Sequence, residues 1–335
     1  MFKCKYIILA VIIILFSSCL IISPGSGDIS GIKGYLGDIP QSDPVYRDID
    51  NHALNTPKSA EGSLESLALY LTEPAKNDLE KVRSIYRWIT MNVEYDVEGL
   101  LQNRPGDNSA QGVLENRTSV CEGYSNLFLQ LAEIAGLETV KISGFAKGYG
   151  YTAGDSITGG SNHAWNAVKI DGAWKLIDNT WGAGYMNQNY KFVKRFSEYF
   201  FLAVPEDFIY DHLPVEQNWQ LLNNPISMQE YEQLPQLLPI FFYCGISLEG
   251  PGKIISGNTY TQTFRTKYDV ALLGRLMQNG SEIRTDIEFS AGDNGYFDIN
   301  TALPGPGEYI LMLFIKEGTG IAGEYEWGAS FKINN

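Results

Sequence analysis

Cys121, His163 and Asp178 are the residues whose types could act together as a nucleophile, a general base and an orienting acid. A thiolate attacks a carbonyl carbon, an imidazole moves the proton, and a carboxylate fixes the tautomer and orientation of that imidazole. The chain has only three histidines, so one within reach of a carboxylate is informative. These residue types predict acyl transfer through a thioester.

Cys121 lies at the start of a predicted helix. Apolar residues recur at helical spacing over 118–135, and Gly136 supplies a left-handed stop. We expect Ser119 to be the N-cap and Glu122 to complete a capping box. The free N–H groups and the positive dipole at a helix start favour the reactive thiolate. A small apolar filler is the alternative role for this cysteine.

A β-hairpin is predicted over 163–178, where Asp171-Gly172 separates two apolar runs. That dipeptide is a strong signal for a two-residue turn, which pairs Ile170 with Ala173. Continued along the strands, this register places Trp165 opposite Asp178.

His163 lies on the same predicted hairpin, opposite Thr180. Because partners on antiparallel strands share a face, His163 and Asp178 become diagonal neighbours roughly 7–8 Å apart at the backbone. A three-residue loop would put them on opposite faces. A lone histidine on a strand is usually structural, and so is a lone aspartate at a strand end. Their shared face is what favours a catalytic pair.

The N-terminus has the layout of an export signal. Lys3 and Lys5 precede an apolar run over 6–16, and small residues follow at 17–19. The ending resembles a lipobox, in which Cys19 would receive lipid; an uncleaved anchor running through 20–22 is the alternative. We therefore expect a signal or anchor at 1–22 and a linker at 23–44. The rest of the chain would lie outside the cytoplasm, membrane-anchored in the cell envelope or secreted.

Charge and spacing exclude several kinds of partner. The net charge of −14 argues against nucleic acid and against electrostatic binding to an anionic membrane. No pair of His or Cys has ligand spacing, so we expect no metal. Residues 148–153 match a dinucleotide fingerprint, but no helix follows, so we expect a mobile flap and no cofactor. Outside the signal only Cys121 and Cys244 remain; we expect free thiols, with a disulfide as the alternative.

Four blocks of sequence occur in order along the chain: Arg83…Tyr86-Arg-Trp88-Ile89…Asn92-Val-Glu-Tyr95-Asp96, Val120-Cys121-Glu122-Gly123-Tyr124, His163-Ala-Trp165-Asn166 and Trp174-Lys-Leu-Ile-Asp178-Asn-Thr-Trp181-Gly182. Together they resemble the transglutaminase-like superfamily, the papain-like clan that also contains peptide N-glycanases. A further segment follows them, Glu198-Tyr-Phe200-Phe201…Pro205…Phe208…His212-Leu-Pro214…Trp219-Gln-Leu-Leu222. It resembles the kyphoscoliosis-peptidase type, and the match runs from about residue 45 to 242, which predicts a domain over 45–240.

The resemblance implies an α+β fold in which the nucleophile's helix packs on an antiparallel sheet. By matching position it makes Cys121 the nucleophile, His163 the general base and Asp178 the orienting acid. Family members without a complete triad act as binding modules, whereas this chain keeps all three residues. From the residues themselves, helices are expected over 64–71 and 79–92 and a strand over 139–146.

Other side chains have supporting roles in this interpretation. The backbone N–H of Cys121 could donate to an oxyanion, whereas the second donor is not assigned. Aromatic candidates for that donor are Trp88, Tyr95 and Trp165, with a core or cleft-wall position as the alternative for each. These three and Trp181 are the candidates for the walls of a substrate cleft. His52 and His212 are expected to be structural.

From residue 241 to 335 the sequence changes to short strands separated by turn-rich segments, which predicts an all-β, immunoglobulin-like sandwich without the Cys–Trp–Cys hallmark. Together the patterns favour an exported, membrane-tethered cysteine enzyme, a peptidase or amidase acting on protein or peptide amides. The alternatives are a cross-linking transglutaminase and a non-catalytic surface binding or scaffold protein that retains the fold.

Overall fold

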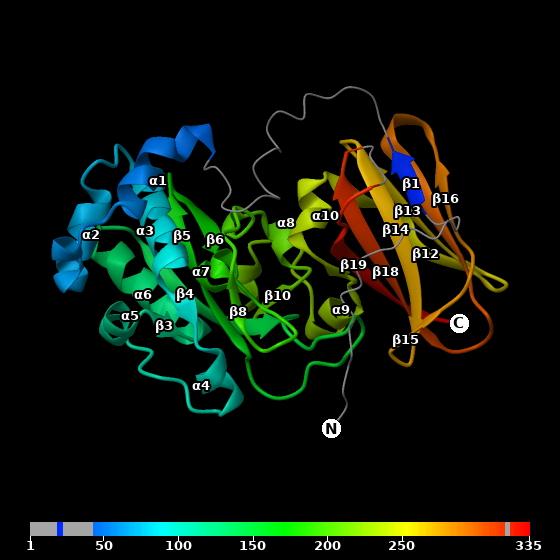
Figure 1. The fold of residues 1–335 in the computed structure, drawn as a ribbon, viewed down its shortest axis with the longest axis horizontal. Helices are drawn as coiled ribbons and strands as arrows, with labels where there is room; N and C mark the ends of the chain where they lie inside the picture. The colour runs from blue at the N-terminus through cyan, green and yellow to red at the C-terminus, as the bar shows by residue number, and fades with distance from the viewer. Residues whose placement is uncertain (1–18, 23–42, 319–321) are drawn as a thin grey trace. The chain divides into compact units, whose positions relative to one another are not determined.

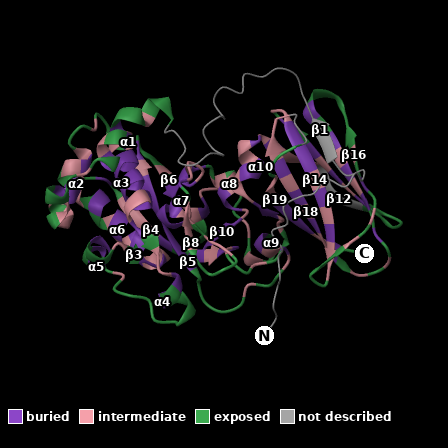
Figure 2. Cartoon of the chain, in the orientation of Figure 1, coloured by how far each residue is buried: buried purple, intermediate pink, exposed green. Residues whose placement is uncertain are grey.

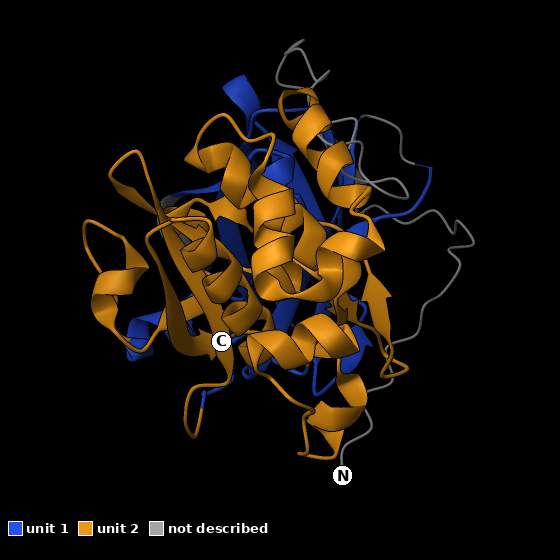
Figure 3. Cartoon of the chain, turned by 90° about the vertical axis from the view of Figure 1, so that its left-hand side faces the viewer, with its two compact units in different colours: residues 1–32, 150–157, 228–335 blue, residues 33–149, 158–227 orange. Residues whose placement is uncertain are grey.

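The computed structural model describes residues 19–22, 43–318 and 322–335 (Figure 1). The chain divides into two compact units, coloured separately in Figure 3. We call residues 33–149 and 158–227 the mixed unit, and residues 1–32, 150–157 and 228–335 the β-rich unit.

The mixed unit is built on a five-stranded antiparallel sheet. Its strand order is β10 (His212–Pro214), β4 (Thr139–Ala146), β5 (His163–Ile170), β6 (Ala173–Ile177) and β9 (Phe201–Ala203). Two smaller pairs join β2 (Glu94–Tyr95) to β3 (Thr118–Ser119) and β7 (Gly184–Met186) to β8 (Phe192–Lys194). The predicted strand over 139–146 is confirmed as β4.

The α-helices of this unit are α1 (Arg47–Leu54), α2 (Leu64–Thr72), α3 (Asp78–Asn92), α4 (Val97–Leu101), α5 (Ala110–Asn116), α6 (Cys121–Ile134), α7 (Asn179–Ala183) and α8 (Pro205–Phe208). Short 3-10 turns lie at Pro44–Tyr46, Lys58–Gly62 and Gln217–Gln220. The helices expected over 64–71 and 79–92 are confirmed as α2 and α3.

The sheet buries side chains on both faces, so that β5 is buried along most of its length (Figure 2). Val168 and Ile170 pack with apolar residues of α2, α3 and α6 in the larger core. Trp165 and Ala167, which alternate with them, pack on the opposite face with Phe208 and other residues of a second core. This alternation is the period-2 pattern of a strand. The expected α+β fold, with the Cys121 helix packed on an antiparallel sheet, is confirmed.

The hairpin forms with the predicted turn. Ile170 pairs with Ala173, and Asp171 and Gly172 both have positive φ, 50° and 79°. These dihedral signs are those of a type I′ turn. The extension beyond the turn is wrong, however. Strand β6 ends at Ile177 because the side chain of Asp178 caps α7, so neither Trp165 with Asp178 nor His163 with Thr180 is a strand pair.

Helix α6 begins at Cys121, as predicted, but without the predicted capping box. Its N-cap is Val120, which makes no side-chain cap bond. Ser119 lies in β3, where its hydroxyl donates to Asn108 Oδ1 at 2.7 Å. Pairing of β3 with β2 takes Ser119 out of the cap position. At the other end Gly136 has φ +78°, and its left-handed conformation ends the helix as expected.

The β-rich unit contains two antiparallel sheets. One has the order β1 (Cys19–Ile22), β14 (Val270–Gln278), β18 (Glu308–Glu317), β19 (Glu326–Asn334) and β11 (Gln236–Leu237), with β15 (Ser281–Ile283) beside β14. The other has the order β12 (Ile246–Ser256), β13 (Thr259–Thr266), β17 (Tyr296–Ala302) and β16 (Ile287–Ala291). Phe264 of β13 meets Phe331 of β19 with ring centroids 5.6 Å apart, so the two sheets face one another.

The unit also includes segments that the expected 241–335 range left out. Two short helices, α9 (Met228–Gln233) and α10 (Pro239–Tyr243), lie near its start, and β11 pairs with β19. Residues 150–157, expected within a mobile flap, belong to this unit as well. There the N–H of Ile157 donates to Glu232 Oε1 at 2.6 Å.

Most of the predicted signal and linker, residues 1–18 and 23–42, lies outside the described residues. Residues 19–22 between them form β1, which pairs antiparallel with β14. Among the described residues, no helix combines the length and hydropathy of a membrane span.

A buried ion network ties the helices of the mixed unit together. Arg83 of α3 binds both carboxylate oxygens of Asp50 on α1, at 2.6 and 2.7 Å, and both carboxylate oxygens of Glu198. Arg87 lies 3.7 Å from Asp50 and stacks on Phe196. Asp50 therefore serves two buried guanidinium groups, which burial would otherwise destabilise.

We predict that Asp50→Ala destabilises the mixed unit by about 3–5 kcal/mol, because it leaves buried positive charge uncompensated. Urea unfolding followed by tryptophan fluorescence reports mainly on this unit, since five of the chain's six tryptophans lie in it: Trp88, Trp165, Trp174, Trp181 and Trp219. The control is Glu138→Gln, which breaks the exposed pair with Lys169 and should cost less than about 1 kcal/mol. Equal losses in the two variants would contradict this prediction.

Candidate active site

Three elements of the mixed unit bring the predicted catalytic residues together, and a fourth adds His212. Cys121 is the first residue of α6, His163 the first residue of β5, and Asp178 the N-cap of α7 directly after β6. The fourth element is β10, which supplies His212. Cys121 is partly exposed, whereas His163 is 8% exposed and Asp178 is fully buried.

His163 and Asp178 make direct contact. Nε2 of His163 lies 2.8 Å from Oδ2 of Asp178, a hydrogen-bond distance. Since Nε2 is engaged by the carboxylate, Nδ1 is the ring nitrogen left for the Cys121 thiol, with which His163 also forms a hydrogen bond. The hydrogen-bonded order is thus thiol, imidazole, carboxylate.

Asp178 is held by backbone as well as by side chains. Its Oδ1 accepts hydrogen bonds from the N–H groups of Thr180 at 2.7 Å and Trp181 at 3.1 Å, the first turn of α7. Burial disfavours the charged carboxylate, but the positive charge and hydrogen bond of His163 and the hydrogen bond of His212 outweigh it. They hold the pKa of Asp178 well below its usual range, so this carboxylate is ionised at neutral pH.

The same contacts polarise the thiol and the imidazole. Burial lowers the pKa of His163, but the Asp178 charge and hydrogen bonds to Asp178 and Cys121 raise it to about 10. Burial raises the pKa of the Cys121 thiol, yet the hydrogen bond and positive charge of His163 and a backbone hydrogen bond at Ala164 leave it lowered. Both shifts favour a thiolate–imidazolium pair at neutral pH.

Cys244 provides a contrast to Cys121. Both are free thiols, as expected. Burial and the nearby negative charges of Glu317 and Glu326 raise the pKa of Cys244 to about 12, and the residue is 1% exposed. The lowered pKa of Cys121 therefore depends on its own surroundings.

His212 is the residue whose position sequence reasoning missed. We expected a structural role only, but its Nε2 lies 3.1 Å from Oδ2 of Asp178, and its Nδ1 lies 2.5 Å from Oδ1 of Asp211. Strand pairing explains the approach: His212 pairs with Ala146 of β4, and β4 pairs with β5. The adjacent Asp211-His212 doublet is the only local signal that could have marked it. His52, by contrast, stacks on Tyr70 and bonds its carbonyl, in keeping with a structural role.

A glycine makes room for this arrangement. Gly144 of β4 pairs with His163, and a Cβ there would lie 2.2 Å from the Trp165 ring and 2.5 Å from the Leu213 carbonyl oxygen. Any side chain at this position would push β10, and with it His212, away from the sheet.

The four aromatic candidates separate by exposure. Trp88 and Trp165 are buried, at 0% and 1% exposed, so the expectation that they line a cleft is wrong. Trp88 packs in the larger core beneath the Arg117 guanidinium, 4.5 Å from its ring centre, and Trp165 packs in the second core. Apolar packing in these two cores therefore buries both tryptophan side chains.

Tyr95 and Trp181 are partly exposed and lie near the site. The Trp181 ring is 5.4 Å from that of His163 and 4.4 Å from that of His212. Burial and then the negative charge of Cys121 raise the pKa of Tyr95, so its phenol stays protonated beside the thiolate. These two residues remain candidates for contacting a substrate.

His163, Asp178 and His212 also form the type of cluster that can bind a metal, with their ligand atoms within 4.8 Å of one another. Both imidazole nitrogens, however, lie at hydrogen-bond distance from the same carboxylate oxygen, 2.8 and 3.1 Å. Zinc bound to nitrogen and oxygen at about 2.0–2.2 Å with tetrahedral angles would hold such ligand atoms farther apart. Hydrogen bonding accounts for the cluster as it stands.

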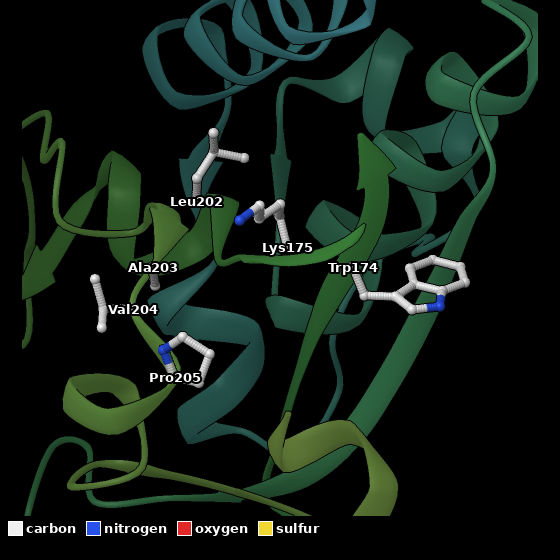
Figure 4. A pocket seen from close by; sticks show the side chains of 6 residues that line it. All are labelled: Trp174, Lys175, Leu202, Ala203, Val204 and Pro205. Carbon is white, nitrogen blue, oxygen red and sulfur yellow. The ribbon is translucent and has the colours of Figure 1, made fainter. Parts of the chain in front are cut away.

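A pocket of about 260 Å³ lies at the β6–β9 edge of the same sheet (Figure 4). Its walls contain none of the three predicted catalytic residues. The lining residues are Trp174, Lys175, Leu202, Ala203, Val204 and Pro205.

Comparison with known proteins identifies the class of domain. Residues 65–179 match the model of the transglutaminase-like superfamily. The chain therefore carries a transglutaminase-like domain, and the assignment made from the sequence is confirmed.

Curated relatives narrow the resemblance. Kyphoscoliosis peptidase of Mus musculus is 38% identical over 201 residues, covering 60% of this chain and 30% of that protein. The Homo sapiens protein of the same name is 35% identical over 206 residues, covering 61% and 30%. Hillarin of Drosophila melanogaster is 30% identical over 235 residues, covering 64% and 28%. The chain spans less than a third of the length of these relatives.

Solved structures overlap the chain weakly. A TGase structure has 17% identity and a TM-score of 0.27, covering 52% of this chain and 40% of that one. An arylamine N-acetyltransferase of Mycobacterium smegmatis has 12% identity and a TM-score of 0.29, covering 77% and 80%.

The raised pKa of His163 predicts a pH-dependent contribution to stability, which is best isolated in a Cys121→Ser background. A histidine whose pKa is raised in the folded state stabilises the fold fully at pH values below its unfolded-state pKa of about 6.5. This stabilisation is lost as the pH rises through the folded-state pKa. The free energy of unfolding of Cys121→Ser minus that of Cys121→Ser/His163→Phe should therefore decrease above about pH 6.5, by at most about 1.4 kcal/mol per pH unit. Urea titrations at several pH values measure it; a difference that stays flat or grows would contradict the prediction.

Proposed function

We propose that this protein is a cysteine enzyme that hydrolyses protein or peptide amide bonds through a thioester on Cys121. The observation that carries the proposal is the hydrogen-bonded series from Cys121 through His163 to Asp178, with Nε2 of His163 2.8 Å from the carboxylate. The transglutaminase-like domain and the kyphoscoliosis peptidase relatives support it.

In the proposed reaction the Cys121 thiolate attacks the amide carbonyl carbon, and the C–S bond forms as the carbonyl becomes an oxyanion. Protonated His163 then gives its proton to the leaving amine as the C–N bond breaks. Water attacks the thioester, His163 takes one proton from it, and the acid and the free thiolate are released. Ionised Asp178 holds the imidazole ring and stabilises its positive form.

The oxyanion requires donors, and two groups suit it. One is the backbone N–H of Cys121 at the start of α6. The other is the hydroxyl of Tyr95, which remains protonated close to the thiolate. Trp88 and Trp165, the other candidates considered from the sequence, are buried in the cores.

Two alternatives keep the same fold. A cross-linking transglutaminase would use the same thioester but pass the acyl group to a lysine amine. Incorporation of a labelled amine into added protein would favour it, whereas release of ammonia or peptides without incorporation would favour hydrolysis. A surface binding or scaffold protein would need no activated thiol at all.

The N-terminal residues support a proposal about location. Lys3 and Lys5, the apolar run over 6–16 and Cys19 suit an exported protein tethered to the membrane through lipid. We predict that the wild-type protein is recovered with the membranes. The Cys19→Ser variant, which cannot receive lipid at this position, should appear in a different fraction or keep an unprocessed N-terminus. Identical fractionation and identical intact mass, apart from the substitution itself, would contradict lipidation at Cys19.

An activated thiol separates an enzyme from a scaffold. We predict that iodoacetamide labels Cys121 at pH values below the ordinary cysteine pKa of about 8.5, and that His163→Ala slows this labelling at least about tenfold. Mass spectrometry of the labelled peptides gives the rate. Cys244 is the internal control, because its raised pKa should keep it unlabelled in both proteins. If Cys121 reacts equally fast with and without His163, the enzyme proposal fails.

A further inference from the structure

Asp178 serves two imidazoles, and the catalytic role proposed above uses only one of them. His212 is 1% exposed, and its ring stacks on Phe208 with centroids 3.9 Å apart. Its Nε2 reaches the same oxygen, Oδ2 of Asp178, that accepts from His163. Its Nδ1 lies 2.5 Å from Asp211, which is also 1% exposed. A buried Asp211–His212 pair thus lies behind the carboxylate.

The proton positions on this pair follow from hydrogen-bond accounting. Ionised Asp178 has no hydrogen to give, so the contact at Oδ2 requires a hydrogen on Nε2 of His212. One further proton lies between Nδ1 and Asp211, either on the ring or on the carboxyl group. In both cases the Asp211–His212 pair has zero net charge and directs an N–H at Asp178.

A second donor changes what Asp178 offers to His163. A carboxylate that accepts a second hydrogen bond is a weaker acceptor for the first and stabilises an imidazolium less. Among the described residues, the other ionisable groups that interact with this region are Cys121, Asp211, Tyr95, Tyr124, whose phenol lies in the field of Asp178, and Lys147, which acts on Asp211. Of these, only Asp211 is hydrogen-bonded to His212 among the described residues.

We propose that His212, held by Asp211, is a positioning residue of this site: its Nε2–H fixes Oδ2 of Asp178 and limits how tightly that carboxylate holds protonated His163. The inference rests on the proposed function for its meaning in catalysis. An imidazolium held too tightly would not release its proton to the leaving amine, so the second donor keeps His163 able to act as an acid. The physical effect, a change in the basicity of His163, can be measured without any reaction.

The test is an NMR titration of the histidine Hε1 protons in the full chain, whose three histidines make assignment practicable. The background is Cys121→Ala, so the result does not depend on whether Cys121 is a nucleophile. His212→Phe keeps an aromatic ring on Phe208 but removes both nitrogens, and His212→Gln keeps an N–H that can reach Asp178.

We expect His212→Phe to raise the pKa of His163 by about one unit, the size expected for one hydrogen bond to a charged group, and His212→Gln to leave it within about 0.3 unit. An unchanged or lowered pKa in the Phe variant would overturn the proposal, and so would equal shifts in the Phe and Gln variants. Failure of Cys121 to react with iodoacetamide would instead count against the proposed function and leave this result standing.

A second measurement needs no substitution at His212. In the protein labelled with ¹⁵N, Nε2 of His212 should carry a slowly exchanging hydrogen throughout the range of about pH 5 to 9, because Asp178 remains an acceptor over that range. An unprotonated Nε2 within that range would overturn the proposal even if the Phe variant did not fold.

Discussion

The buried, ionised carboxylate of Asp178 is the group on which the candidate site depends. It is fully buried and accepts four hydrogen bonds, from the N–H groups of Thr180 and Trp181 and from the imidazoles of His163 and His212. A buried charge is costly unless such partners surround it. Since the partners come from α7, β5 and β10, the carboxylate is satisfied only when those elements have assembled.

The fold positions each residue of the site in a different way. Helix α6 places Cys121 at its first turn, where the backbone favours a thiolate. The hairpin brings the end of β6 beside β5, and the cap of α7 turns the Asp178 side chain into position. Two apolar cores, one on each face of the sheet, keep these elements in register. Precise placement of the polar groups is thus a consequence of apolar packing.

Local sequence signals predicted the parts of the site that local interactions determine. The Asp171-Gly172 turn set the hairpin register, and helical spacing ending at Gly136 placed Cys121 at a helix start. The turn-based register predicted that His163 and Asp178 lie close together, and the two residues do touch. Asp178 reaches His163 from the cap of α7, however, and not from a paired strand position.

The other predictions failed where the structure depends on contacts between segments far apart in the chain. The predicted capping box at Ser119 does not form because β3 pairs with β2, and no local sequence pattern predicts that pairing. His212 reaches Asp178 only because β10 adds to the edge of β4, a contact between segments far apart in the chain. For Trp88 and Trp165 the sequence left both a cleft wall and a core position open, and only the assembled cores decide between them.

The central claim is that Cys121 and His163 form an ion pair supported by Asp178. Ultraviolet difference spectroscopy of wild type against Cys121→Ser, recorded as a function of pH, measures the thiolate of Cys121 directly and needs no substrate. The account predicts that thiolate absorbance persists well below the ordinary cysteine pKa of about 8.5 and that this acid-side absorbance disappears in His163→Ala. A single titration at about 8.5 or above, the same with and without His163, would contradict it.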